Sequence, residues 1–423
     1  MLLAKALERN PELVRTAIDF HQGGAIPADC YLIDLDAIAE NARLLADEAK
    51  RWKLRTYLMT KSHNRNPYVT RVALEQGLRS TVAVDTMEAR VLNRFGLPVG
   101  HVGHLSNIAK NAVSDILAME PEVVTVFTHE AAKNVSDAAK AMGIEQDLYV
   151  RVNKPGDEFF PGMVGGWTED ECVEGIRPIL DLPNVRIAGL TAFVNMSYQA
   201  TDLTGAEPTS TFFTMMRAKE KLEQAFGLQD LRVNAPGCNN CATFGTLAKH
   251  GATEVEPGIG LMGSSLAHAH QDLPEKPAQV YVSEVMHHWQ GDAYVLVGGL
   301  AYYTGVGSES DFPIRCATGT TFEAAQDNFM RLAGRSLPVG HGVCVDGANG
   351  KVGDSAVFAF RAQLYGNRAP VAIVSGIASG EPEVEALFDN AANALDESYN
   401  PIPTQTVVER IEECVARRYA LVA

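Results

Sequence analysis

The stretch Arg55-Thr-Tyr-Leu-Met-Thr-Lys61-Ser-His63 is followed by Asn64-Arg-Asn-Pro67. Its β-branched and aromatic residues predict a buried strand, and the Asn-Arg-Asn-Pro sequence is typical of a break in regular structure. The predicted strand therefore ends near Lys61. Enzymes built on β/α barrels carry their reactive groups at the carboxyl ends of the strands, so this position is a candidate for chemistry.

Lys61 has two interpretations. In a dry pocket, burial disfavours the ammonium form, and a neutral amine can attack a carbonyl to form a Schiff base. A lysine at a strand end can equally extend its side chain to solvent. The strand alone leaves both interpretations open.

Predicted strands and helices alternate regularly on either side of this stretch, which favours a parallel sheet with right-handed crossovers. From the Lys61 strand onward the strands number eight, the count of a closed (β/α)8 TIM barrel: residues 55–61, 80–84, 99–105, 123–127, 147–152, 185–193, 231–234 and 253–256. Helices are predicted over residues 35–52, 68–76, 87–95, 109–119, 130–142, 170–180, 211–226 and 242–249.

After about residue 270 the sequence becomes rich in short β segments separated by Gly and Asp turns. This pattern predicts a second, mostly antiparallel β domain. The expected organisation is a helical lead-in over residues 1–28, a barrel domain over 29–270, and a C-terminal β domain over 271–423 whose final helices cover Glu381–Leu395 and Thr406–Arg418.

The composition is that of a globular protein. Of 423 residues, 46% are hydrophobic and 21% are charged, and no apolar run is long enough to span a bilayer. The net charge of −16 argues against binding to nucleic acid or to an anionic membrane. The seven scattered cysteines do not resemble a secreted disulfide framework, so we expect reduced thiols and a cytoplasmic location.

A second informative stretch is Glu256-Pro-Gly258-Ile259-Gly-Leu-Met-Gly263. A carboxylate at a strand end can accept a hydrogen bond from a protonated ring nitrogen, and the backbone amides of the following turn can hold a phosphate. Glu-Pro-Gly is also a common turn, so this stretch alone is weak support for a cofactor site.

With Lys61 upstream and a β domain downstream, the order of these parts resembles the fold-type III pyridoxal-phosphate enzymes. These include alanine and ornithine racemases and the ornithine and diaminopimelate decarboxylases. The sequence is most similar to the YhfX-like group of alanine-racemase-like proteins, from Tyr31-Leu-Ile-Asp-Leu-Asp to Gly353-Asp354. The resemblance implies pyridoxal 5′-phosphate as cofactor and a homodimer with shared active sites.

The resemblance assigns roles to residues of this sequence. Lys61 matches the lysine that forms the Schiff base, Phe193 the side chain that packs on the cofactor ring, and Glu256 the group at the ring nitrogen. Glu256 matches the decarboxylases, whereas alanine racemase has an arginine there. A carboxylate favours a protonated ring, which makes the ring a stronger electron sink. The phosphate is assigned to Gly237, Cys238, Asn239, Gly258 and Ile259.

The same resemblance places a second acid/base near Tyr302 and Tyr303, which in the family reaches the partner subunit's active site. Lys61 and one tyrosine would supply a proton acceptor on each face of a substrate. Tyr302 is slightly favoured over Tyr303, and packing at an interface is the alternative for both.

Other polar motifs allow further interpretations. Cys238-Asn-Asn-Cys241 could be redox-active or bind metal, but the phosphate-turn interpretation is favoured because no second cysteine pair accompanies it. His101 and His104, separated by two residues on one predicted strand, are expected to point to different sides, with one lining the pocket near the cofactor and the other structural. His287-His288 and His341-x-x-Cys344 resemble, more weakly, the metal site of D-serine dehydratases of this fold; the prediction remains no metal.

The sequence therefore predicts a pyridoxal-phosphate-dependent amino acid racemase that abstracts and returns the α-proton through a quinonoid-type intermediate. One alternative is a decarboxylase or a D-amino-acid dehydratase on the same scaffold. Another is a non-catalytic pyridoxal-phosphate-binding protein, against which the second domain argues.

Overall fold

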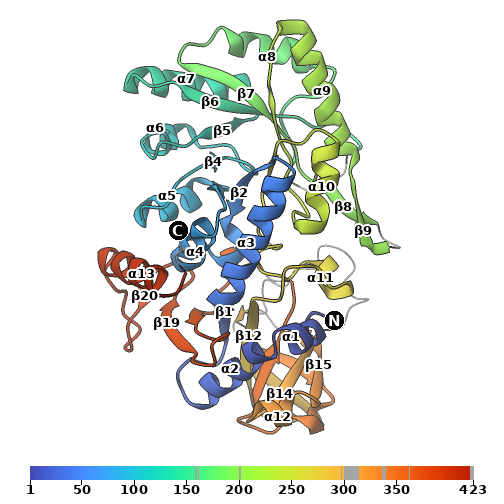
Figure 1. Cartoon of the computed structure of the whole chain (residues 1–423), viewed down its shortest axis with the longest axis vertical. Helices are drawn as coiled ribbons and strands as arrows, with labels where there is room; N and C mark the ends of the chain where they lie inside the picture. Colours follow the sequence, from blue (N-terminus) through green and yellow to red (C-terminus); the bar gives the residue numbers. More distant parts are fainter. Residues whose placement is uncertain are drawn as a thin grey trace. The chain divides into compact units, whose positions relative to one another are not determined.

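A computed structural model describes the chain apart from residues 158–159, 161, 200–201, 297, 300–313, 336–339, 362 and 420–423 (Figure 1). The chain forms two compact units. The barrel unit comprises Leu44–Lys61 and Gly77–Gly258. The terminal unit comprises Met1–Arg43, Ser62–Gln76 and Ile259–Ala423.

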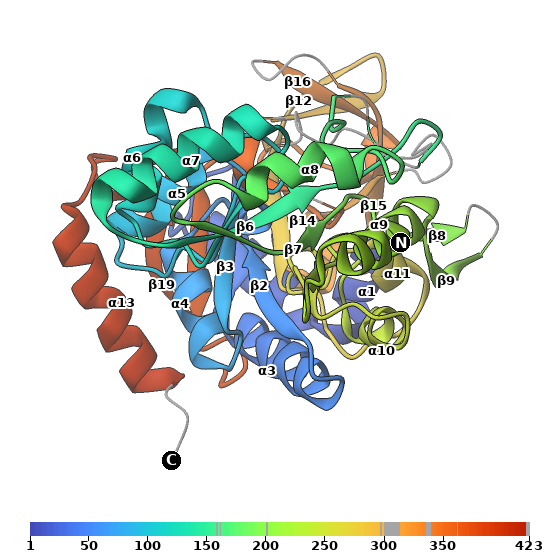
Figure 2. The same cartoon turned by 90° about the horizontal axis from the view of Figure 1, so that it is seen from above.

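The barrel unit is organised around a closed barrel of parallel strands, which confirms the predicted β/α barrel (Figure 2). The strands follow the order of the chain, and the last returns to the first, because Val255 in β11 pairs with Thr56 in β2. Each of the predicted strands is present. The strands are β2 (Arg55–Met59), β3 (Ser80–Ala83), β4 (His101–Val102), β5 (Val123–Val126), β6 (Gln146–Arg151), β7 (Val185–Thr191), β10 (Arg232–Asn234) and β11 (Glu254–Val255).

Helices follow the strands, as their amphipathic spacing and capping residues predict. Asp85 caps α5 and Thr128 caps α7 through side-chain oxygens that accept backbone N–H groups, and Gly143 ends α7 in a left-handed conformation with φ 70°. The helices are α3 (Leu35–Arg51), α4 (Pro67–Glu75), α5 (Thr86–Arg94), α6 (Val113–Leu117), α7 (His129–Met142), α8 (Cys172–Leu180), α9 (Ser210–Phe226) and α10 (Cys241–Lys249).

Two features of the barrel unit differ from the sequence prediction. Strand β4 has only two residues, His101–Val102, because Gly103 turns the chain with φ +85°. Between β7 and α9 lies a hairpin, β8 (Met196–Gln199) and β9 (Asp202–Pro208), that the sequence analysis did not predict.

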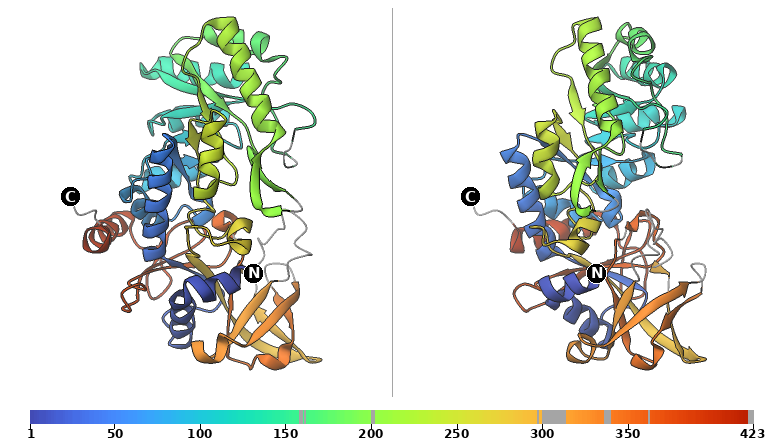
Figure 3. Two further views of the ribbon diagram at one scale, coloured as in Figure 1. Left: turned by 45° about the vertical axis from the view of Figure 1, so that its right-hand side comes forward. Right: turned by 90° about the vertical axis from the view of Figure 1, so that its right-hand side faces the viewer.

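The terminal unit contains a second closed barrel, which is antiparallel as predicted (Figure 3). It closes because β12 pairs with both β13 and β17. Its strands, in spatial order, are β12 (Gln279–Trp289), β13 (Asp292–Leu296), β16 (His341–Val345), β15 (Phe329–Arg335), β14 (Arg315–Gly319) and β17 (Ser355–Phe358). The short helices α11 (Leu266–His270) and α12 (Phe322–Ala325) belong to the same unit.

The antiparallel barrel extends into a longer sheet through β1 (Cys30–Asp34). This strand lies within the predicted 29–270 domain, yet it pairs antiparallel with β12 and parallel with β18 (Val371–Ser375). Strands β19 (Glu383–Phe388) and β20 (Ala394–Leu395) continue the sheet from β18.

The predicted helix over Glu381–Leu395 is therefore wrong. Glu383 to Phe388 consists largely of helix-favouring residues, but the pairing of Phe388 with Val371 of β18 outweighs that local preference. The final helix is confirmed as α13 (Thr404–Arg418), close to the predicted 406–418.

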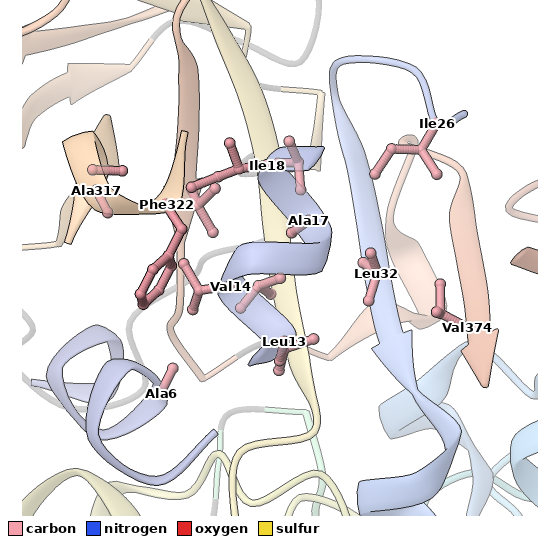
Figure 4. Packing of buried hydrophobic residues seen from close by; sticks show 14 of the residues in the cluster. Ala6, Leu13, Val14, Ala17, Ile18, Ile26, Leu32, Ala317, Phe322 and Val374 are labelled. Atoms are coloured by element: carbon pink, nitrogen blue, oxygen red, sulfur yellow. The ribbon is translucent and has the colours of Figure 1, made fainter. Parts of the chain in front are cut away.

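The lead-in helices form part of the terminal unit's core. Helix α1 (Leu2–Arg9) precedes α2 (Pro11–Gln22), whose Leu13, Val14, Ala17 and Ile18 are completely buried (Figure 4). They pack in one cluster with Leu32 and other residues of the sheet. Burying each large aliphatic side chain contributes roughly 1.5–3 kcal/mol. Among the helices of the described residues, none is long and apolar enough to cross a bilayer.

Within the terminal unit, the segment after Lys61 contains a histidine that should make stability sensitive to acid. His63 is completely buried, and its Nε2 lies 3.0 Å from Thr70 Oγ1. Burial, and then the nearby Arg65, lowers the pKa of His63 to about 3 from 6.5. The unfolded chain therefore binds a proton that the folded chain does not bind between these values, so this contribution to stability is lost as pH falls below 6.5.

We expect the free energy of unfolding of the wild type to fall by about 2 kcal/mol more than that of His63→Gln between pH 7 and pH 5. Urea unfolding of both proteins at the two pH values measures this difference. The exposed His288 gives the matched control, because His288→Gln should lose as much stability as the wild type. Equal losses in the wild type and His63→Gln would contradict the prediction.

Candidate active site

Lys61 lies just beyond the carboxyl end of β2, in the short 3₁₀ turn Thr60–His63, and is partly buried. Strand β11 is hydrogen-bonded to β2 and leads directly into Glu256. The ladder continues past both strands, since the Met59 N–H donates to the Pro257 carbonyl at 2.8 Å. Lys61 and Glu256 therefore follow adjacent strands at the same end of the barrel. Enzymes with β/α barrels have their catalytic residues at this end.

The Glu256 carboxylate is completely buried, and only one of its two oxygens accepts hydrogen bonds from the described residues. Its Oε1 accepts hydrogen bonds from His101 Nδ1 at 2.7 Å and from Asn234 Nδ2 at 3.0 Å. Its backbone N–H donates to Asn239 Oδ1 at 2.7 Å. Its Oε2 has no hydrogen-bond partner among the described residues. A buried carboxylate oxygen without a donor is costly, so Oε2 is positioned to accept a hydrogen bond from a bound molecule.

His101 and His104 both face Glu256, so the expectation that they point to different sides is wrong. The turn at Gly103 redirects the chain, and His104 Nε2 comes to 3.6 Å from Glu256 Oε2. Burial is the largest cause that lowers the pKa of His104 well below 6.5, followed by His101, Arg151 and Lys61. His104 is therefore a neutral imidazole, and neither of its nitrogens has a hydrogen-bond partner in the described parts of the chain.

Phe193 and Arg151 lie beside His104. The Phe193 ring meets the His104 ring edge to face, with centroids 5.5 Å apart. The Arg151 guanidinium is buried and donates to the His104 carbonyl at 3.1 Å and to the Met163 carbonyl at 3.2 Å. Burial lowers the pKa of Arg151 to about 10, partly offset by the charge of Glu256.

The turn after β10 precedes the N-terminus of α10. Gly237 and Cys238 have positive φ values of 111° and 49°, and a Cβ at Gly237 would approach Val194 Cγ1 to 2.9 Å. The Asn239 side chain donates to the Ala235 and Gly237 carbonyls.

Helix α10 starts from an N-cap at Asn240, whose side-chain oxygen accepts the Ala242 N–H, so the turn leads into the positive end of the helix dipole. A helix N-terminus beside a left-handed turn suits an anion. Gly258 ends the barrel unit after Glu256-Pro257, and Ile259 is the first residue of the following segment of the terminal unit.

These residues fit pyridoxal phosphate. The cofactor needs an amine for its aldehyde, an acceptor for a protonated ring nitrogen and N–H donors for its phosphate. Three parts of the barrel unit offer these groups: Lys61, the turn leading into α10, and Glu256 Oε2, which has no hydrogen-bond partner among the residues that the structure describes.

The comparison with protein families agrees with this arrangement. Residues 33–266 match the family described as alanine racemase, N-terminal domain, and residues 280–384 match the one described as YhfX-like, C-terminal domain. The chain belongs to the alanine racemase N-terminal domain family. The match to this family spans Lys61, Phe193 and Glu256.

Individual relatives extend the similarity over most of the chain. The chain is 33% identical over 399 residues to the Uncharacterized protein YhfX of Escherichia coli (strain K12), covering 93% of this chain and 100% of that protein. It is similar in fold to a D-threonine aldolase from Filomicrobium marinum, with TM-score 0.65, 19% identity and coverage of 87% of this chain and 95% of that one. The alanine racemase from Corynebacterium glutamicum gives TM-score 0.56 and 18% identity, covering 78% and 90%. At these identities the two structures show a shared fold.

The site contains four buried residues that were not predicted from the sequence. Arg151, Asn234, Thr125 and Thr191 all end or lie in barrel strands and are buried around Glu256 and the histidines. An arginine inside the apolar run Leu148-Tyr-Val-Arg151-Val152 of a predicted barrel strand is unusual, and this signal could have identified Arg151.

Of the alternative metal ligands, His287 and His341 are brought together, with ring centroids 5.0 Å apart, but Cys344 does not join them. His341 and Cys344 fall on opposite faces of β16, because side chains alternate along a strand. In the described part of the chain, the one cluster of three His, Cys, Asp or Glu ligands is His101, His104 and Glu256. Both ring nitrogens of His101 already contact Glu256 and Thr125, which leaves that residue no lone pair for a metal. Tyr302 and Tyr303 lie outside the described residues.

Proposed function

We propose that this protein binds pyridoxal 5′-phosphate through Lys61 and racemises an amino acid. The observation that supports it most strongly is Glu256 Oε2, a buried carboxylate oxygen without a partner in the described residues, on the strand next to that of Lys61. An anion in that position would hold a proton on the cofactor's ring nitrogen, because opposite charge and a hydrogen bond both favour the cation.

Each end of the cofactor has a proposed binding group. The Lys61 amine would take the aldehyde, Phe193 would pack on the ring, and Glu256 would bind the ring nitrogen. The phosphate would be bound by backbone amides of the Gly237-Cys238-Asn239 turn, together with those of Gly258 and Ile259. When bound, the cofactor supplies an electron sink that stabilises negative charge on the substrate's α-carbon.

The chain's own residues would then move the proton. Lys61 Nζ would exchange the α-proton on one face of the substrate. Tyr302 or Tyr303, contributed by the partner subunit of a homodimer, would act on the opposite face. The buried aromatic and apolar surroundings would exclude water from the exchange.

Two other functions stay as alternatives. A decarboxylase or a D-amino-acid dehydratase could use the same lysine and carboxylate, because a strong electron sink also assists those reactions. A protein that binds the cofactor without catalysis would need the lysine and the phosphate turn but no second acid/base.

The test is exchange of the α-proton in deuterium oxide with a panel of L- and D-amino acids. We expect at least one substrate to lose its α-proton signal by NMR and to yield its enantiomer on chiral chromatography. Carbon dioxide release or keto-acid formation instead would identify a lyase. Cofactor binding with no exchange in any amino acid would leave the non-catalytic alternative.

A further inference from the structure

Two hydrogen-bonded chains of buried side chains converge on Glu256 Oε1, and each begins at a threonine. In the first, Thr125 Oγ1 lies 2.6 Å from His101 Nε2, and His101 Nδ1 lies 2.7 Å from Glu256 Oε1. In the second, Thr191 Oγ1 donates to Asn234 Oδ1 at 2.7 Å, and Asn234 Nδ2 donates to the same Oε1 at 3.0 Å. All five residues are at most 4% exposed.

The hydrogen positions follow from what each atom can do. A carboxylate oxygen only accepts, so His101 Nδ1 must carry the hydrogen of its bond to Glu256. The Thr125 hydroxyl can donate its hydrogen to Nε2, which leaves the imidazole with a single N–H and no charge. Thr191 fixes the Asn234 amide in the same way, by satisfying Oδ1 and directing Nδ2 toward Glu256.

The alternative is an imidazolium with hydrogens on both nitrogens and Thr125 as the acceptor. That form would place a second buried cation near Arg151, which already affects this cluster electrostatically. It would also pair with the negative charge of Glu256, so that less of this charge would favour a proton on the cofactor ring. The neutral form avoids both effects.

We propose that Thr125 and His101 are positioning residues for the reaction. Thr125 fixes His101 as the neutral Nδ1–H tautomer, and this neutral His101 leaves the negative charge of Glu256 available to the ring nitrogen of the cofactor. This inference rests on the proposed function, because it concerns how that cofactor's ring is protonated. It goes further in assigning a role to residues that do not touch the cofactor.

The experiment uses protein labelled with [15N]histidine and reconstituted with pyridoxal phosphate that carries 15N in its ring. We expect the His101 spectrum, assigned with His101→Asn, to show one protonated and one unprotonated nitrogen. We expect the ring nitrogen to appear protonated. Thr125→Val should shift the unprotonated His101 resonance and weaken cofactor binding by up to about tenfold, since one buried hydrogen bond is lost.

Three further variants separate positioning from general packing. Thr125→Ser keeps the hydroxyl and should restore the wild-type spectrum and affinity. His101→Asn keeps a donor to Glu256 and should bind the cofactor better than His101→Leu. Thr191→Val is the matched control: it removes a threonine hydroxyl that is also two hydrogen bonds away from Glu256 Oε1 but should leave the His101 resonances unchanged. Circular dichroism and thermal unfolding would verify that each variant folds.

The outcomes distinguish this inference from the proposed function. A doubly protonated His101 in the wild type, an unprotonated ring nitrogen, or identical spectra for Thr125→Val and Thr125→Ser would overturn the inference while the cofactor assignment stood. Failure of the wild type to bind pyridoxal phosphate would overturn the proposed function, and the histidine spectrum of the protein as purified would then still decide the tautomer.

Discussion

Replacing Lys61 with alanine should abolish the covalent attachment of pyridoxal phosphate and lower α-proton exchange by at least about 10³-fold, since both the nucleophile and one acid/base group are removed. The position of Lys61 just past β2 and beside the strand that leads to Glu256 is the reason for expecting so large an effect. The measurement is the visible absorption of the purified protein before and after borohydride, followed by mass spectrometry of the modified peptide. Wild-type protein should carry the reduced cofactor on Lys61.

Lys140 provides the control, because it is an exposed lysine on α7. Lys140→Ala should keep the yellow absorption and the wild-type exchange rate. Recovery of the reduced cofactor on another lysine in the wild type would refute the role of Lys61. A wild-type protein that stays colourless after incubation with pyridoxal phosphate would refute the cofactor itself.

Replacing Glu256 with glutamine should slow α-proton exchange by about 10²-fold and weaken cofactor binding, because a charge-assisted hydrogen bond contributes roughly 1.5–3 kcal/mol. Glutamine has nearly the same size and can still accept hydrogen bonds from His101 and Asn234 through one oxygen. The other position then carries an N–H donor, which favours an unprotonated ring nitrogen. The measurement combines exchange rates in deuterium oxide with cofactor titration.

The matched control for this change is Glu254→Gln on the same strand. Glu254 is also buried, but its carboxylate accepts a hydrogen bond from the Tyr149 hydroxyl and lies 3.6 Å from Arg232 Nη1, and neither of these residues is assigned to the cofactor. We expect this variant to lose stability while keeping the exchange rate. Equal exchange rates in Glu256→Gln and the wild type would rule out Glu256 as the ring partner.

How well the sequence predicted the fold depended on the kind of interaction that determines each element. The barrel strands and most of their helices were predicted because apolar spacing, caps and breakers act within a few residues. Strand β19 was missed because its state depends on pairing with β18. Strands β14 and β15 were also not predicted, although they pair with each other, because β15 contains the helix-favouring residues Met330, Arg331, Leu332 and Ala333.

The same distinction between local and long-range interactions decided which site residues could be predicted from the sequence. Lys61 and Glu256 stand next to breakers, Asn64-Arg-Asn-Pro67 and Pro257-Gly258, so their positions at strand ends could be inferred from local sequence. The contact of His101 and His104 with the same carboxylate could not, because it depends on the backbone turn at Gly103 and on the order of strands around the barrel.

The pairing of β1 with β18 has a consequence for synthesis of the chain. Tyr31 emerges from the ribosome early, but its partner in β18 is Val371, near the other end. At a synthesis rate of roughly 5–20 residues per second, β18 is made tens of seconds after β1 and the two helices that precede it. Meanwhile the segments of the barrel unit up to Gly258 are already complete. Nascent chains that stall before β12 should therefore carry an unpaired β1 and the exposed apolar faces of α1 and α2, and be recognised by chaperones.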